Sequence, residues 1–184
     1  DVSLVESAFR ANTAEYGGGL YWSAGAPTIS GCVVYGNTAT GWAEVTSYDV
    51  VDPNDPNIVT TVTVVGDHDA GSGGGLYCLA SDALIENTFI TENTTNGVGG
   101  GVYFADGMPV LKNCVVNGNS AYIGGGGVAS HWSAAPTITN CTIAQNQASD
   151  PNESGRGYGG GLFCSYESQT ILVNSILWNN QGRT

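Results

Sequence analysis

The chain has 184 residues, and its 16 Asp and Glu residues outnumber its 4 Lys and Arg residues, which gives a formal net charge of −12. Such an acidic surface repels phosphate backbones, so the composition argues against nucleic acid as a partner. The sequence contains no apolar run long enough for a membrane-spanning helix, and we expect no direct membrane insertion.

The chain starts inside a pattern that it later repeats. Leu4, Phe9 and Asn12 already occupy the places that equivalent residues take further on, and the pattern stops just after Asn180. We see neither a signal-like stretch after the first residue nor the dedicated polar caps that free solenoids need. We therefore expect residues 1–184 to form a single domain that is a segment of a longer chain.

Two short motifs alternate along the sequence. The first is a glycine triplet followed by Leu or Val, and the triplets begin at Gly17, Gly73, Gly99, Gly125 and Gly159. The second is aliphatic-x-x-Asn, and its final residues form the column Asn12, Asn37, Asn93, Asn119, Asn146 and Asn180. Repetition at a fixed period is typical of stacked supersecondary units that bury their apolar faces against their neighbours.

The period and the internal pattern together predict the fold class. Asn93 and Asn119 are 26 residues apart, and Asn119 and Asn146 are 27 apart. Apolar residues alternate within the second motif, which indicates strands, whereas glycine triplets would destabilise a helix by about 1 kcal/mol per glycine. The sequence therefore predicts an all-β parallel β-helix of about seven coils, one of them degenerate, stacked at roughly 4.8 Å.

The Asn column has a structural interpretation that we prefer to ligand binding. An Asn amide both donates and accepts hydrogen bonds, so one Asn per coil can form a ladder along the stack. A second column, just before the small residue of each repeat, contains Gly31, Asn87, Asn113, Asn140 and Asn174. Gly and Asn tolerate a left-handed backbone, which predicts a tight bend there.

Residues 40–70 are irregular, and two interpretations remain open. The segment fits a degenerate coil that has lost its glycine triplet, which we favour, or an inserted hairpin that pairs 44–51 with 58–65. The turn between those stretches carries Asp52, Asn54, Asp55 and Asn57, whose oxygens could bind a structural calcium ion. Ordinary turn chemistry explains the same residues, and we expect no other cofactor.

The five cysteines fall into two columns of the repeat. Cys32, Cys114 and Cys141 share one column, while Cys78 and Cys164 share the other. We expect them to act as small core residues, with a vertical disulfide between Cys114 and Cys141 as the alternative. Their spacing is not that of a zinc site.

The two motifs together resemble the repeats of polymorphic outer membrane proteins, which belong to the pectin-lyase-like superfold. The family motifs are GGA-aliphatic and FxxN, whereas here the third residue is Gly and an aliphatic residue replaces Phe. The resemblance covers nearly the whole chain and implies a right-handed helix and a secreted or surface-exposed, often adhesive, protein. It implies no catalytic residues, and the same superfold also includes polysaccharide lyases and hydrolases.

The residues offer weak support for an enzyme. A lyase needs a base such as Arg or Lys beside clustered carboxylates, and the only basic side chains are Arg10, Lys112, Arg156 and Arg183. Asp82 and Asp106 follow the glycine strand of adjacent coils and could be neighbours, as a glycosidase pair would be. We expect no catalytic residue and interpret both as exposed loop acids.

An aromatic column is the better binding candidate. If the residue after each glycine triplet points inward, then Tyr21, Tyr77, Tyr103 and Phe163 point outward on one face. Such a column could stack on sugar rings or contact another subunit, unless a loop covers it.

These features lead to one main hypothesis and one alternative. The main hypothesis is a non-enzymatic extracellular or cell-surface β-helix with a structural or adhesive role, which could assemble into filaments. Its partners would be copies of itself or the rest of a longer solenoid. The alternative is a module that binds or degrades polysaccharide and uses the Tyr face with Asp82 and Asp106 on surface glycans.

Overall fold

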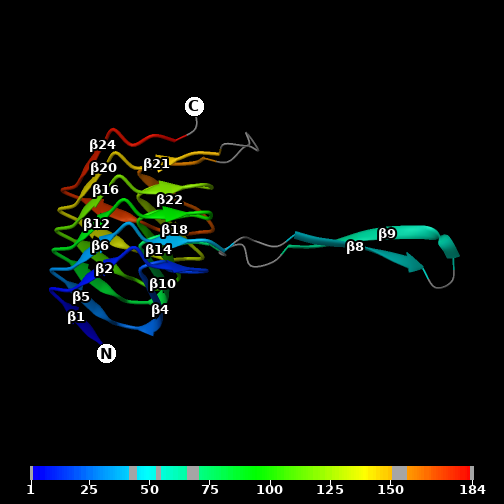
Figure 1. The fold of residues 1–184 in the computed structure, drawn as a ribbon, viewed down its shortest axis with the longest axis horizontal. Coiled ribbons are helices and arrows are strands. Elements are labelled where there is room, and N and C mark those ends of the chain that lie inside the picture. The colour runs from blue at the N-terminus through cyan, green and yellow to red at the C-terminus, as the bar shows by residue number, and fades with distance from the viewer. Residues whose placement is uncertain (1, 42–44, 53–54, 66–70, 151–156, 183–184) are drawn as a thin grey trace.

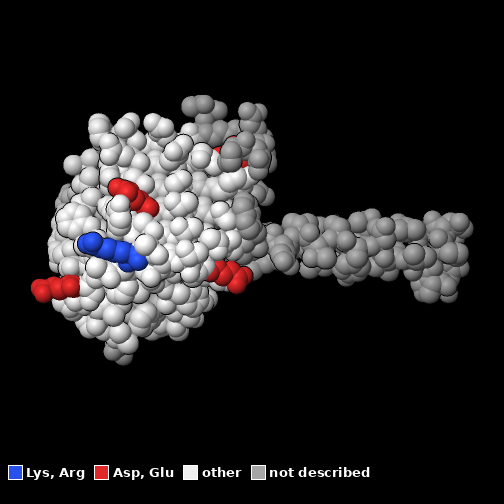
Figure 2. All heavy atoms as spheres, in the orientation of Figure 1, with Lys and Arg blue, Asp and Glu red and all other residues white. Residues whose placement is uncertain are grey.

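A computed structural model describes residues 2–41, 45–52, 55–65, 71–150 and 157–182. These residues contain strands and turns but no helix, so none of them forms a helix that could cross a membrane. The strands are short, and most lie in a regular stack of coils (Figure 1), which Figure 2 draws with all heavy atoms in the same orientation. The all-β prediction is confirmed.

Four parallel sheets run along the stack, two of six strands and two of five, and successive coils add their strands to them in order. Sheet 1 contains β1 (Ser3–Val5), β5 (Thr28–Ser30), β11 (Leu84–Glu86), β15 (Val110–Lys112), β19 (Thr137–Thr139) and β23 (Ile171–Val173). Sheet 2 contains β2 (Ala8–Arg10), β6 (Val33–Tyr35), β12 (Phe89–Thr91), β16 (Val115–Asn117), β20 (Thr142–Ala144) and β24 (Ile176–Trp178).

The other two sheets complete each coil. Sheet 3 contains β3 (Thr13–Ala14), β7 (Thr38–Ala39), β13 (Thr94–Thr95), β17 (Ser120–Ala121) and β21 (Gln147–Ala148). Sheet 4 contains β4 (Leu20–Gly25), β10 (Leu76–Ser81), β14 (Val102–Ala105), β18 (Val128–His131) and β22 (Leu162–Cys164). This arrangement is a parallel β-helix, as predicted.

The core consists of columns of identical or similar aliphatic side chains. The register pairs Ile85 with Leu111 in sheet 1 and Ile90 with Val116 in sheet 2, so equivalent residues stack directly. Side chains of both sheets meet those of sheet 4 in one continuous buried cluster. Side chains point alternately inward and outward along each three-residue strand, and this alternation is sufficient to define the face that packs in the core.

The predicted bend lies between sheets 1 and 2. Asn87, Asn113, Asn140 and Gly31 all have positive φ, between 51° and 62°. The left-handed backbone turns the chain sharply from one sheet into the next, which explains the preference for Gly and Asn in this column.

Residues 45–52 and 55–65 pair as a hairpin rather than as a coil. β8 (Val45–Asp52) pairs with β9 (Asp55–Val65) in antiparallel fashion, and in Figure 1 the hairpin extends away from the stack. β5 pairs directly with β11, and β7 with β13, so this segment adds no strand to the stack. For the described residues 45–52 and 55–65, the favoured coil interpretation is therefore wrong, and their pairing is that of the hairpin alternative. Two Val- and Thr-rich stretches that are close in sequence can pair locally, whereas a coil needs the glycine triplet that this segment lacks.

Candidate binding surfaces

The Asn column forms a continuous hydrogen-bonded ladder, as predicted. The Nδ2 atom of Asn93 donates to Oδ1 of Asn119 at 2.9 Å, and Nδ2 of Asn119 donates to Oδ1 of Asn146 at 2.9 Å. Each Oδ1 also accepts a backbone N–H from the preceding coil, as from Asn93 to Asn119 at 2.9 Å. The second Nδ2 hydrogen of Asn119 goes to the Ile90 carbonyl oxygen at 2.9 Å. The side-chain amides thus form hydrogen bonds within the stack, which supports the structural interpretation of this column over ligand binding.

Of the two alternatives for the aromatic column, exposed or covered, the structure shows the covered one for two of its residues. Tyr21 is exposed, but Tyr77 and Tyr103 are buried and Phe163 is partly buried. The rings of Tyr77 and Tyr103 lie 4.9 Å apart between centroids.

The segments that lead into the glycine triplets cover this column. Val98 and Ile123 belong to these segments, and they pack with Tyr77, Tyr103 and Ala129 in a second apolar cluster outside the coil. Side chains on the outer face of sheet 4 therefore form an additional core, and Tyr77 and Tyr103 are not accessible to a sugar.

His131 belongs to the same outer cluster. Its ring lies edge-on to Tyr103 at 5.3 Å and to Phe163 at 5.4 Å. Burial among these rings disfavours the charged imidazolium and lowers the pKa of His131 to about 4, from an ordinary value of 6.5. The side chain is therefore neutral in the folded protein at neutral pH.

The depressed pKa of His131 predicts a loss of stability in mild acid. Above about pH 6.5 the residue is neutral in both states, whereas between about pH 6.5 and 4 the unfolded chain binds the proton more tightly. Urea denaturation at pH 7 and pH 5 is expected to show that the free energy of unfolding falls by about 2 kcal/mol more in the parent protein than in His131→Phe. The carboxylates titrate in both proteins, so the difference isolates His131. Equal pH dependence in the two proteins would contradict the assignment.

Asp82 and Asp106 lie in turns of adjacent coils, as expected. Both are exposed. Asp82 Oδ1 accepts the backbone N–H of Met108 at 2.8 Å, and Asp106 Oδ1 accepts that of Gly107 at 2.8 Å. Each carboxylate is therefore engaged in shaping the turn between sheets 4 and 1.

The calcium hypothesis lies outside the described residues. Asn54 is not described, and for Asp52, Asp55 and Asn57 the structure describes only their place in the hairpin strands. Elsewhere in the described part of the chain, no group of three or more His, Cys, Asp or Glu side chains could hold a metal ion.

All five cysteines are free thiols, and four of them are buried. The backbone N–H of Cys114 points to Sγ of Cys141 at 3.5 Å, so these two stack in the ladder without a disulfide. The hydrogen bond between the two thiols, together with burial, raises the pKa of Cys114, and burial alone raises that of Cys78 to about 12. The buried thiols are thus core residues, as expected, while Cys164 is exposed.

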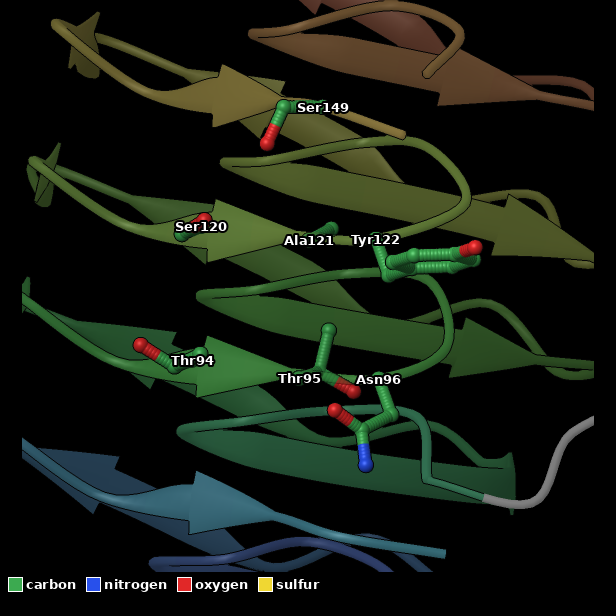
Figure 3. A pocket seen from close by; sticks show the side chains of 7 residues that line it. All are labelled: Thr94, Thr95, Asn96, Ser120, Ala121, Tyr122 and Ser149. Carbon is green, nitrogen blue, oxygen red and sulfur yellow. The ribbon is translucent and has the colours of Figure 1, made fainter. Parts of the chain in front are cut away.

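The structure adds a small polar pocket over sheet 3 that the sequence analysis missed. The pocket has a volume of about 170 Å³ and is lined by Thr94, Thr95, Asn96, Ser120, Ala121, Tyr122 and Ser149 (Figure 3). Its hydroxyl and amide groups can form hydrogen bonds, but the lining contains no acid or base. The sequence feature that could have predicted this pocket is the polar residue at the outward position of each strand that follows a ladder Asn.

A larger pocket lies at the turns that follow β18 and β22. It has a volume of about 410 Å³ and is lined by Trp132, Ser133, Tyr166 and Glu167. The rings of Trp132 and Tyr166 stack with centroids 4.4 Å apart and an interplanar angle of 13°. The sequence analysis did not single out these residues, because they lie outside the two repeated motifs.

Four continuous parallel sheets and a central Asn ladder define the class of parallel β-helix solenoids. The family described as right handed beta helix region matches residues 74–184, which is more than half of the chain. The chain belongs to this right-handed β-helix family. The comparison with curated proteins gave no match, and neither did the comparison with solved structures.

Proposed function

We propose that the chain is a non-enzymatic structural and adhesive β-helix of the cell surface or extracellular space, which stacks end to end with another β-helix coil. The observation that carries this proposal is that one coil-to-coil contact repeats along the stack. Equivalent core residues pair in register from coil to coil, as Leu111 with Ile138 and Ile138 with Leu172 do in sheet 1, and the Asn ladder follows them. The same contact can join coils of separate chains.

The Asn ladder supports a head-to-tail contact. Every rung has the same direction, because the backbone N–H and Nδ2 of one Asn donate to Oδ1 of the next. A coil added after Asn180 would continue the ladder if it presented another Oδ1 there, and Asn12 carries that group at the opposite end of the stack. A contact between opposite ends is heterologous, and it extends into a filament when a second copy supplies the coil.

The repeats and the turns are consistent with this role. The glycine triplets and aliphatic-x-x-Asn motifs support a relationship to polymorphic outer membrane protein repeats, which is part of the proposal. The engagement of Asp82 and Asp106 in turn backbone supports a structural use of these acids. Of the alternative hypothesis we retain glycan binding but not glycan degradation. The aromatic residues that favour it are not those of the buried column.

Sedimentation velocity over a range of concentrations tests the assembly. We expect species larger than the monomer to grow with concentration and to appear as rods by electron microscopy. Leu177→Asp should restore the monomer, because it places a charge in the core column at the contact. Ile176→Asp is the matched control, since this residue lies on the same strand but faces outward. A parent protein that stays monomeric at its highest soluble concentration would refute assembly by self-stacking.

A further inference from the structure

We propose that Trp132 and Tyr166 form a binding platform for a pyranose unit of an uncharged polysaccharide. This inference names a ligand class for the adhesive part of the proposed function and therefore rests on it. The platform lies on turns between sheets 4 and 1, away from the core columns that the assembly would use.

The two aromatic residues are held by the backbone of successive coils. Trp132 follows β18, Tyr166 follows β22 by two residues, and the N–H of Ser133 donates to the carbonyl oxygen of Tyr166 at 2.9 Å. The stacked rings remain 41% and 53% exposed. The two rings are therefore held against each other by the backbone of their turns and remain accessible to a ligand.

The turn itself does not require aromatic residues. The strand register places Ala24, Ala80 and Asp106 at the same corner in the three preceding coils. All three have positive φ, between 47° and 64°, as do Trp132 at 54° and Tyr166 at 52°. A left-handed backbone suits small or short polar residues and is unfavourable for bulky ones. Trp132 and Tyr166 are therefore bulky residues in a backbone conformation that disfavours them. Residues in such unfavourable conformations are common at functional sites.

The chemistry of the pocket fits a sugar. The C–H face of a pyranose can stack on an indole or phenol ring, while Ser133 and Glu167 at the rim offer a hydroxyl and a carboxylate to its hydroxyl groups. Glu167 and the net charge of −12 disfavour acidic sugars. The two rings stack on each other rather than surrounding a space, which favours a flat ligand over a quaternary ammonium ion.

A binding panel tests the proposal with the intact chain. The panel contains neutral glycans, uronate-containing and sulfated glycans, and immobilised choline. We expect binding to one or more neutral glycans, weakened at least about tenfold by Trp132→Ala and by Tyr166→Ala, which corresponds to the loss of about 1.4 kcal/mol. Trp178→Ala is the matched control, because this Trp is also exposed but lies on β24, and its affinity should stay within about twofold of the parent.

The variants are expected to fold, because Ala already occupies this corner in two other coils. Circular dichroism melting therefore accompanies each binding measurement. Binding to no glycan, or glycan binding that both Ala variants retain, would overturn the proposal. Binding to acidic glycans or choline alone would also overturn it, in favour of an electrostatic or cationic ligand. Loss of glycan binding leaves the sedimentation result unaffected, so failure of the platform and failure of the assembly are distinguishable.

Discussion

Replacing Asn119 with alanine is expected to lower the free energy of unfolding by about 4 kcal/mol, as measured by urea denaturation. The substitution removes the acceptor for the backbone N–H and the Nδ2 of Asn93, both at 2.9 Å. It also removes the donor to the Ile90 carbonyl oxygen at 2.9 Å. These groups lie in the dry interior of the stack, and each buried polar group without a partner costs about 1–3 kcal/mol.

Asn12→Ala provides the matched control in the same column. Asn12 is exposed, and its side chain donates to Asn37 at 3.0 Å in the outermost rung. Water can replace that hydrogen bond, so the expected loss is below about 1 kcal/mol. If both variants lost the same stability, the ladder would not be a buried network in which each rung depends on its neighbours.

The substitution Gly100→Ala is expected to prevent folding of the chain or to destabilise it beyond measurement. A Cβ atom at Gly100 would lie 2.5 Å from the carbonyl oxygen of Ser120 in β17 and still closer to that of Gly126 in the next glycine triplet. Both obstacles are backbone atoms, so relieving the clash requires adjacent coils to separate. Circular dichroism and size-exclusion chromatography of the purified variant measure the outcome.

Gly36→Ala separates this clash from the general cost of losing a glycine. Gly36 has a φ of 62°, but no atom lies within 4 Å of the position that its Cβ would take. Backbone strain alone should then cost about 1 kcal/mol. A folded Gly100→Ala protein with a similarly small loss would show that the coils are not packed this closely.

The third glycine of the triplet has its own physical reason. A Cβ at Gly101 would lie 2.6 Å from the carbonyl oxygen of Gly127 and 3.0 Å from Nδ2 of Asn119. The Asn ladder and the glycine triplet therefore face each other across the coil. This contact explains why the chain carries Gly at this position.

Two questions that the sequence left open depend on the same kind of contact. The hairpin of β8 and β9 competes with a coil that the length of 40–70 would also allow, and the choice depends on which partner each strand finds. The outward-facing Tyr77 and Tyr103 alternate as surface residues would, yet Val98 and Ile123 fold over them. Periodicity shows which side of a strand a residue occupies, but it does not show what covers that side.

The sequence by itself determined the repeat, the parallel β-helix, the inward columns, the bend at Gly31 and Asn113, and the Asn ladder. Each of these depends on contacts between equivalent residues of neighbouring coils, so a regular period is enough to predict them. Only the tertiary structure decided the burial of the aromatic column, the neutral His131 within it, and the stacking of Trp132 on Tyr166. These features lie on the outside of the stack. The repeat places equivalent residues side by side there, as Tyr77 and Tyr103, but it does not show which of them a neighbouring segment covers.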